Sequence, residues 1–139
     1  MRSLGLDVGD RRIGVAMSDP SEILASPLTT IPRDDDEETI DAILALVHKH
    51  GAERIVVGIP YSMNGNVGTQ ASKVMSFIAK LSKRAKIDVA TWDERLSTVA
   101  AQRLMAETGS RRKEARLRRD AAAAAYILQG HLDSLRPSD

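Results

Sequence analysis

The spacing of apolar residues changes along the chain, and this change limits the possible folds. Three short extended apolar stretches occupy the first third, at residues 4–8, 13–17 and 25–31. Beyond them, helical spacings of apolar residues alternate with β-branched runs. Strands that come first and then alternate with helices predict an α/β fold, with a mixed sheet of about five strands, the first three antiparallel, and helices on both faces.

Local signals predict where the elements begin and end. Gly9-Asp10 predicts the turn of a hairpin between the first two strands, and Pro27 places the third strand at an edge or a bulge. The acidic residues 34–38 suit a helix N-terminus better than a metal site, because consecutive carboxylates splay around a helix. We expect the later elements to be a helix at 40–47, a strand at 54–60, a loop at 62–69, a helix at 71–85, a strand at 87–92 and helices at 97–107 and 117–135.

Length and composition favour one soluble domain, residues 1–139. Cysteine is absent, which excludes disulfides and cysteine-ligated zinc and fits the cytoplasm. Asp7 comes too early in the chain for a signal peptide to precede it. The longest apolar run, 121–128, is far shorter than the ~20 residues that cross a bilayer, so we expect no membrane association.

Basic residues are concentrated in one segment. Residues 95–119 hold eight basic and two acidic side chains, whereas residues 1–94 and 120–139 are each net acidic. Such a segment is either a surface that binds phosphates or a solvated helix face, and charge alone does not separate the two. Aromatic residues make up only 3% of the chain, so recognition of a nucleic acid should depend on backbone charge and shape.

Two acidic positions coincide with the ends of predicted strands. Asp7 lies between Leu6 and Val8, where a charge is costly unless it is paired or binds a cation. A role in capping the following turn is the alternative. Asp93 and Glu94 follow another strand directly, and ligands bind at the carboxyl ends of strands in open α/β sheets. Exposed loop acids are the alternative there.

A third acid interrupts the basic segment. Asp120 begins the alanine-rich final helix and should stand at the edge of its buried side. A salt bridge to Arg116 or Arg119 is the simpler explanation. Taken together, however, the acids come from three elements that a mixed sheet could bring side by side. Carboxylates that lie side by side repel one another unless divalent cations such as Mg²⁺ or Mn²⁺ bind them. Two such ions ~3.5–4 Å apart are a known arrangement for phosphodiester cleavage.

Four blocks of the sequence resemble the YqgF family, also called RuvX. They follow one another in family order between residue 4 and about residue 134, so the resemblance covers nearly the whole chain. The blocks are Leu4-Gly5-Leu6-Asp7-Val8-Gly9-Asp10-Arg11-Arg12-Ile13-Gly14-Val15-Ala16-Met17-Ser18-Asp19, then Val56-Val57-Gly58-Ile59-Pro60 with Met63-Asn64-Gly65, then Trp92-Asp93-Glu94-Arg95-Leu96-Ser97-Thr98, and finally Asp120, Ala123-Ala124 and Ile127-Leu128-Gln129-Gly130.

The resemblance implies a ribonuclease H-like fold related to Holliday junction resolvases. It also implies a metal-dependent endonuclease that matures the 5′ end of pre-16S ribosomal RNA. The catalytic and metal-binding acids of the family fall on Asp7, Glu94 and Asp120, and Asp93 has a supporting or structural role. The chain departs from the family at Asp10, where a small hydroxyl residue is common, and in the residues just before Asp120.

Other functions stay open on the sequence alone. The chain could resolve branched DNA, or it could be a non-catalytic module that binds ribosomal RNA or the ribosome. A third alternative is the phosphate-binding hairpin of the actin and sugar-kinase superfamily, which would require a second such domain. The sequence does not decide between a monomer and a weak homodimer, although a junction resolvase needs two active sites related by symmetry.

The expected partner is therefore a nucleic acid, either pre-rRNA or branched DNA, and through it ribosomal particles. The loop at 64–69 could present backbone N–H groups to phosphate, or it could be a plain turn. Arg112 and Lys113 follow Gly109-Ser110 and should lie on a loop that becomes ordered on binding. The residues expected to contact nucleic acid are Arg95, Arg111, Arg112, Lys113, Arg116, Arg118, Arg119, Asn64 and Gly65.

Overall fold

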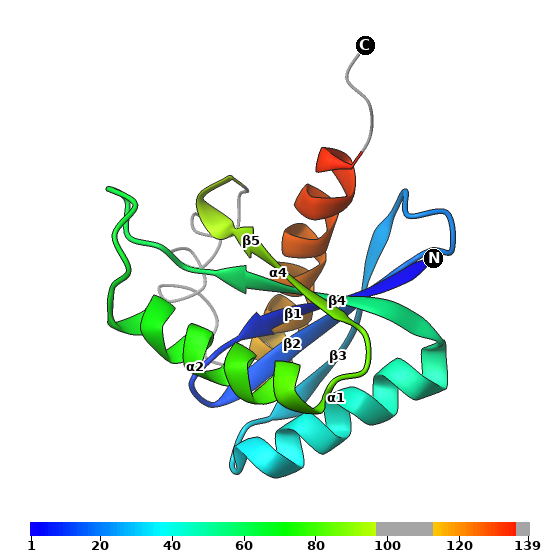
Figure 1. Cartoon of the computed structure of the whole chain (residues 1–139), viewed down its shortest axis with the longest axis horizontal. Helices are drawn as coiled ribbons and strands as arrows, with labels where there is room; N and C mark the ends of the chain where they lie inside the picture. Colours follow the sequence, from blue (N-terminus) through cyan, green and yellow to red (C-terminus); the bar gives the residue numbers. More distant parts are fainter. Residues whose placement is uncertain (97–112, 136–139) are drawn as a thin grey trace.

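One mixed sheet forms the centre of the molecule (Figure 1). The computed structural model describes residues 1–96 and 113–135. The sheet order is β3-β2-β1-β4-β5, antiparallel on the β3-β2-β1 side and parallel on the β1-β4-β5 side, so the predicted mixed sheet is confirmed. The strands are β1 (Arg2–Val8), β2 (Arg12–Ser18), β3 (Ala25–Pro32), β4 (Ala52–Ile59) and β5 (Asp88–Asp93).

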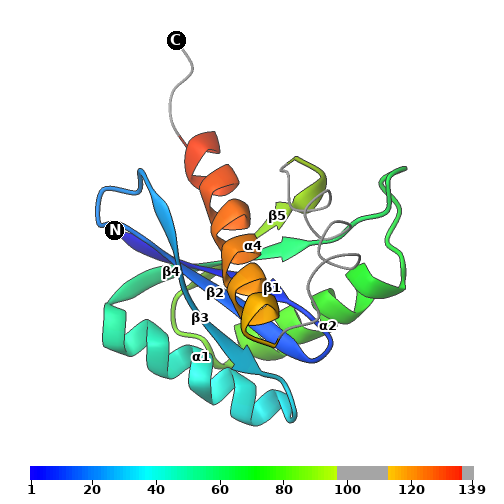
Figure 2. The same cartoon turned by 180° about the vertical axis from the view of Figure 1, so that it is seen from behind.

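Helices cover both faces of the sheet, as predicted. Helices α1 (Asp36–His50) and α2 (Thr69–Arg84) lie on one face, and α4 (Lys113–Ser134) crosses the other (Figures 1 and 2). A short 3₁₀ helix, η1 (Glu94–Leu96), follows β5 directly. The helix predicted at 97–107 lies outside the described residues. None of the helices in the described part of the chain is long and apolar enough to span a bilayer.

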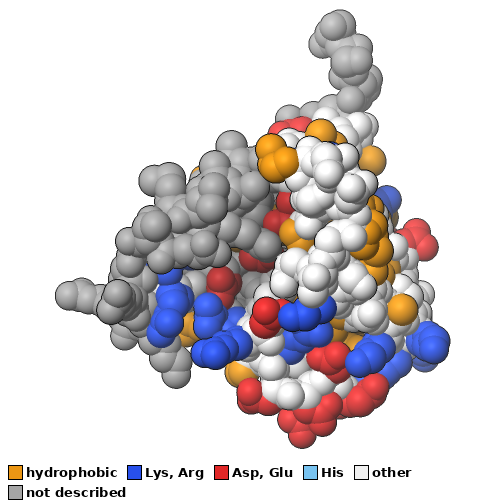
Figure 3. Space-filling model, turned by 90° about the vertical axis from the view of Figure 1, so that its left-hand side faces the viewer, with side chains coloured by type: hydrophobic (Ala, Val, Ile, Leu, Met, Phe, Trp, Pro, Cys, Tyr) orange, Lys and Arg blue, Asp and Glu red, His pale blue; other side chains and the backbone are white. Residues whose placement is uncertain are grey.

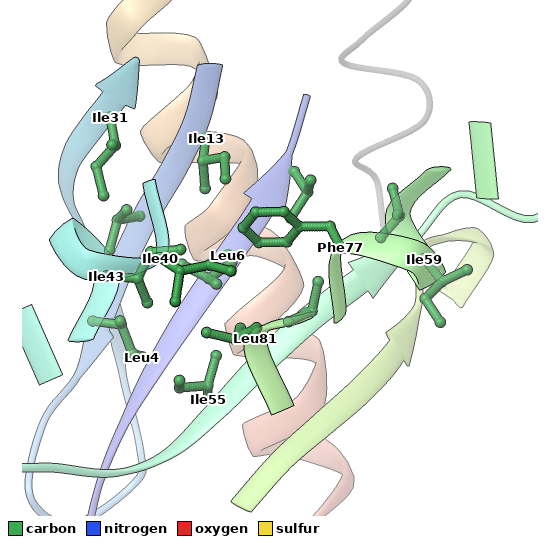
Figure 4. Close-up of a cluster of buried hydrophobic side chains, with 14 of the residues drawn as sticks. Leu4, Leu6, Ile13, Ile31, Ile40, Ile43, Ile55, Ile59, Phe77 and Leu81 are labelled. Carbon is green, nitrogen blue, oxygen red and sulfur yellow. The ribbon is translucent and has the colours of Figure 1, made fainter. Parts of the chain in front are cut away.

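The alternation of side chains along β1 separates two cores. Leu4 and Leu6 point into the larger core with Phe77 and Leu81 of α2 (Figure 4). The positions between them point the other way, because successive side chains of a strand face opposite sides of the sheet. A Cβ built on Gly5 would lie 2.7 Å from the Cβ of Leu128 in α4. Asp7, two residues further along, therefore also faces α4.

Small residues let α4 lie close to the sheet. Ala123 and Ala124 are buried against Ala16 and Val56. Two hydrogen bonds fix the helix along β3. The Thr30 hydroxyl donates to the Leu117 carbonyl at 2.7 Å, and the Ala25 N–H donates to the Gln129 side chain at 2.9 Å. These bonds set the register of α4 on the sheet.

Two local predictions are confirmed on the other side of the sheet. The Asp35 side chain accepts a hydrogen bond from the Glu37 N–H at 2.9 Å, so the acidic cluster begins α1 as expected. β3 is an edge strand, and its register against β2 shifts next to the Pro27 pair. Proline is tolerated at such places because it has no N–H to donate to the ladder.

The start of the last helix was predicted wrongly. α4 begins at Lys113, so Lys113 belongs to the helix and not to a loop, and Asp120 lies in its second turn and not at its start. The apolar spacing that marks the buried side becomes regular only from Leu117. The four helix residues before it are Lys, Glu, Ala and Arg, which are all strong helix formers, and the helix extends through them without needing an apolar contact.

Candidate active site

Asp7 lies near the end of the central strand β1 and is only 7% exposed. On each side of Asp7, the neighbouring strand has a glycine. Gly14 of β2 is its direct pairing partner. On the other side, the parallel register pairs Leu6 with Val57, so the next residue of β4, Gly58, lies beside Asp7. A buried carboxylate is thus placed between two residues that have no side chain.

The space left by the two glycines is occupied by the elements that carry the other predicted acids. A Cβ on Gly14 would lie 1.9 Å from the carbonyl oxygen of Asp120. A Cβ on Gly58 would lie 2.5 Å from Cδ1 of Ile127 in α4 and 3.0 Å from Cγ of Glu94. The Asp120 backbone therefore rests on the strand at one side of Asp7, and the Glu94 side chain rests on the strand at the other. The structure gathers the three residues around one part of the sheet, from β1, η1 and α4.

Glu94 is the most buried of the three acids. It is 3% exposed, and burial raises the pKa of its carboxyl to about 7, with a further contribution from the negative charge of Asp93. Glu94 begins the 3₁₀ helix that follows β5, and its side chain lies against Gly58 of the neighbouring strand β4. A carboxyl with such a pKa loses its proton near neutral pH.

Asp93 points elsewhere. Its carboxylate accepts hydrogen bonds from Arg95, with Nη2 at 2.6 Å and Nε at 3.1 Å, and this pairing lowers the pKa of Asp93. The Arg95 guanidinium also lies 5.6 Å from the centre of the Tyr61 ring and next to Gly65. Asp93 therefore holds Arg95 against the loop that follows β4, in keeping with the supporting role expected for it.

Asp10 also lies away from the three acids. It is exposed in the β1–β2 turn, where its carboxylate is 3.8 Å from Lys73 of α2. It lines a shallow groove of about 370 Å³ between this turn, the start of α1 and α2. Lys80 and Arg33 in the same groove each pair with Asp36, so the charges there are largely balanced.

The Asp120 carboxylate is bound by a residue that the sequence analysis missed. Arg12 Nε donates to Asp120 Oδ2 at 2.6 Å, whereas the alternative considered from the sequence was a salt bridge to Arg116 or Arg119. Arg12 begins β2 and lies two residues before Gly14, so it shares the face of Asp7. That spacing was available in the sequence, but only the docked position of α4 shows which acid Arg12 reaches.

No ready-made metal centre is present in residues 1–96 and 113–135: no three His, Asp or Glu side chains there are arranged to hold an ion. The residues around Asp7 nevertheless fit Mg²⁺ or Mn²⁺ in their chemistry. They offer carboxylate oxygens alone, which hard divalent cations prefer. They also surround a part of the sheet where glycines replace side chains on both sides of Asp7. The assignment of the three acids as metal ligands stays a prediction.

The predicted nucleic-acid contacts are only partly described. Arg116 and Arg118 are exposed on α4, and Arg119 is half-buried. Arg111, Arg112 and the side chain of Lys113 lie outside what the structure describes. Figure 3, which views the molecule from the left-hand side of Figure 1, shows basic side chains next to acidic ones on this surface.

The loop after β4 forms a compact turn. The Gly65 N–H donates to the Ser62 carbonyl at 2.8 Å, and the Asn66 N–H donates to the Asn64 side chain at 3.1 Å. Gly65 has a φ of 86°, which glycine adopts without strain. Because these two N–H groups bond within the turn, they favour the plain-turn alternative. Arg95, which lies against the turn, is the better candidate for a phosphate contact.

The fold defines a protein of the ribonuclease H-like class. Two solved structures share the fold. "T. thermophilus RuvC in complex with Holliday junction substrate" has a TM-score of 0.60 at 17% identity, covering 96% of this chain and 94% of that one. "Crystal structure of Fowlpox virus resolvase and substrate Holliday junction DNA complex" has a TM-score of 0.56 at 11% identity, covering 99% and 100%.

The chain belongs to the RuvX family. The family pattern, described as "RuvX: Holliday junction resolvase", matches residues 1–134. A "Putative pre-16S rRNA nuclease" of Desulforamulus reducens is 46% identical, covering 96% of this chain and 98% of that protein. A protein of the same name from Clostridium novyi is 47% identical, covering 97% and 100%. The family resemblance predicted from the sequence is confirmed, and the chain is a nuclease that acts on phosphodiester bonds.

Proposed function

We propose that this chain is a divalent-metal-dependent endonuclease that matures the 5′ end of pre-16S ribosomal RNA in the cytoplasm. The observation that carries the metal-dependent site is the position of Asp7. It is a buried carboxylate flanked by Gly14 and Gly58, with Asp120 above one glycine and Glu94 above the other. The substrate is proposed because relatives at 46% and 47% identity carry the name of a pre-16S rRNA nuclease.

The acids themselves would hold Mg²⁺ or Mn²⁺. Asp7 supplies a charge fixed by the central strand, and Glu94 supplies a second carboxylate once it has lost its proton. Asp120 would supply the third carboxylate from α4, the helix that packs on this face of the sheet. When bound, the ions would activate the attacking water and stabilise the leaving oxygen. Water is partly excluded at Asp7 and Glu94, and electrostatic interactions are stronger in such an environment.

Cleavage of a defined RNA tests the proposal. The purified protein should cut a transcript that spans the 5′ end of 16S rRNA in the presence of Mg²⁺ or Mn²⁺, and primer extension should map the cut to the mature end. EDTA should abolish the cut. An Asp7→Asn protein prepared in parallel controls for a contaminating nuclease. Equal cleavage by both preparations would exclude the proposed site.

Resolution of branched DNA is the second candidate, because the matching family pattern is described as a Holliday junction resolvase. A resolvase cuts two strands in symmetric positions and needs two active sites in one complex. Offering the enzyme a four-way junction and the RNA transcript under the same conditions separates the two candidates. Light scattering of the protein alone and with each substrate should show a monomer or weak dimer if RNA is the substrate.

A non-catalytic role in binding the ribosome is a different outcome of the same experiments. It would give binding to ribosomal particles or rRNA without any cut. It would also leave binding unaffected by Asp7→Asn and by EDTA, because the acids would then serve only the fold.

A further inference from the structure

Arg12 and Asp120 form an ion pair at the edge of the proposed site. Nε of Arg12 lies 2.6 Å from Oδ2 of Asp120, which is the distance of a strong charge-assisted hydrogen bond. The side chains are 33% and 26% exposed, so solvent weakens this pair only in part. The two residues are 108 positions apart in the chain, and the pair forms only because α4 docks on β2.

Arg12 also lies close to Asp7 along the sheet. Asp7 pairs directly with Gly14, and Arg12 is two residues before Gly14 on the same strand. It is therefore the diagonal neighbour of Asp7 on the face that α4 covers. Diagonal neighbours of an antiparallel pair are within reach of long side chains. One guanidinium is thus placed next to the region in which the metal ligands are proposed.

The carboxylates themselves do not form an ion-binding group in the structure. Within the described ranges 1–96 and 113–135, no three acidic or His side chains could hold a metal ion as they stand. Oδ2 of Asp120 accepts a hydrogen bond from the guanidinium of Arg12. For Asp120 to become a ligand, that oxygen must leave the guanidinium.

We propose that Arg12 is a positioning residue that competes with the divalent ion for Asp120. In the metal-free protein it neutralises Asp120 and holds its carboxylate on the sheet. When the ion binds, Asp120 exchanges the guanidinium for the ion. Arg12 is then available to the anionic phosphodiester at the point where cleavage would occur. This inference rests on the proposed function, because it assumes that Asp120 is a ligand.

Metal affinity measured without substrate tests the exchange. Isothermal titration of Mn²⁺ at one fixed pH should show Arg12→Gln binding the ion about three- to tenfold more tightly than the wild type, as expected from losing a half-buried competing pair. Arg11→Gln is the matched control. It removes an exposed guanidinium from the same turn and should leave the affinity unchanged.

Arg12→Lys is the second variant and decides the question if Arg12→Gln does not fold. An ammonium lacks the planar fork that holds a carboxylate, so its Mn²⁺ affinity should lie between those of the wild type and Arg12→Gln. Circular dichroism checks the fold of each variant. Affinity equal to or weaker than that of the wild type in every folded Arg12 variant would overturn the exchange.

Asp7→Asn separates this inference from the function on which it rests. If Asp7→Asn loses Mn²⁺ binding while the Arg12 variants show no gain, the metal site stands and the exchange fails. If Asp7→Asn binds Mn²⁺ as the wild type does, the ion is not at the proposed site, and both ideas fail. Loss of binding in Asp7→Asn with a gain in Arg12→Gln supports both.

Discussion

Asp7 is a charged residue in a strand whose neighbouring side chains are apolar. It lies between Leu6 and Val8 on the central strand and is almost fully buried. Burial of a carboxylate costs free energy unless a cation or hydrogen bonds compensate it. A carboxylate kept at such a buried position suits a role in chemistry, and this makes Asp7 the most informative position to change.

We expect Asp7→Asn to abolish cleavage that depends on Mg²⁺ or Mn²⁺ and to leave the fold intact. Asparagine has nearly the same shape, but it lacks the negative charge that would hold the ion. Single-turnover cleavage of the RNA transcript measures the first effect, and thermal unfolding measures the second. The melting temperature should be unchanged or higher. A variant that unfolds at room temperature would mean that Asp7 serves the fold.

Glu94 makes stability depend on pH in the metal-free protein. Burial, and then the charge of Asp93, raise its pKa from 4.5 to about 7. The folded chain thus holds this proton more tightly than the unfolded chain. The cost of ionising the buried group is absent below about pH 4.5, grows from there to pH 7 and is complete above it.

Glu94→Gln removes this cost, because glutamine does not ionise. In EDTA, the variant should gain stability relative to the wild type as the pH rises from 4.5 to 7, by up to about 3 kcal/mol. At pH 4 the two proteins should unfold at nearly the same urea concentration. Urea titrations at several pH values measure the difference, and a constant difference across this range would show that Glu94 titrates normally.

At the scale of elements, the contact between α4 and the sheet depends on glycine at three strand positions. Gly14 is the tightest of these, because a Cβ there would lie 1.9 Å from the Asp120 backbone, which cannot move as a side chain can. Gly14→Ala should therefore push the first turns of α4 off β2. We expect a loss of about 1–3 kcal/mol or more in the free energy of unfolding, together with loss of metal binding.

Gly68→Ala is the matched control for this prediction. Gly68 caps α2 with an extended backbone that alanine adopts, and nothing lies within 4 Å of a Cβ there. Its substitution should cost less than about 1 kcal/mol. Equal losses in the two variants, measured by urea denaturation, would mean that the close approach of α4 does not matter.

The elements themselves could largely be predicted from the sequence, because their signals are local. The hairpin, the acidic start of α1 and the edge position of β3 depend on turn residues, capping residues and Pro27. The ion pair between Arg12 and Asp120 could not be predicted in this way. It depends on the register at which α4 packs against β2. That register is set by long-range contacts such as the hydrogen bond from Thr30 to Leu117.

At the scale of the whole molecule, affinity for a polyanion must come from the small part of the protein surface that is basic. Residues 1–94 are net acidic, whereas 95–119 carry eight basic side chains and two acidic ones. Arg116 and Arg118 of this segment are exposed on α4, in the turns that lead to Asp120. Basic side chains there would offset the repulsion between the phosphate and the acids.

Replacing Arg116 and Arg118 together with Ala should weaken binding to any RNA sequence about equally. Each lost phosphate contact should reduce the slope of log affinity against log salt by roughly 0.7 to 0.9. Fluorescence anisotropy at several salt concentrations, in EDTA so that no cleavage occurs, measures both effects. Mn²⁺ affinity should stay near the wild-type value.

Lys49→Ala provides the control. Lys49 is an exposed cation in the last turn of α1, just before β4 begins and therefore away from the end where β4 approaches Glu94. If this change affects the salt slope as much as the pair on α4, the attraction is general and α4 is not the docking surface.

The order of β1, η1 and α4 in the sequence also has a consequence for the timing of synthesis. A ribosome makes Asp7 first, then Glu94, and Asp120 only when the last helix is produced. Until α4 emerges, the glycine-lined face of the sheet is uncovered, and Arg12 has no carboxylate of α4 to bind. A nascent or truncated chain therefore carries two of the three acids without the third. If Asp7, Glu94 and Asp120 act together as proposed, a chain whose α4 has not yet been translated would be inactive.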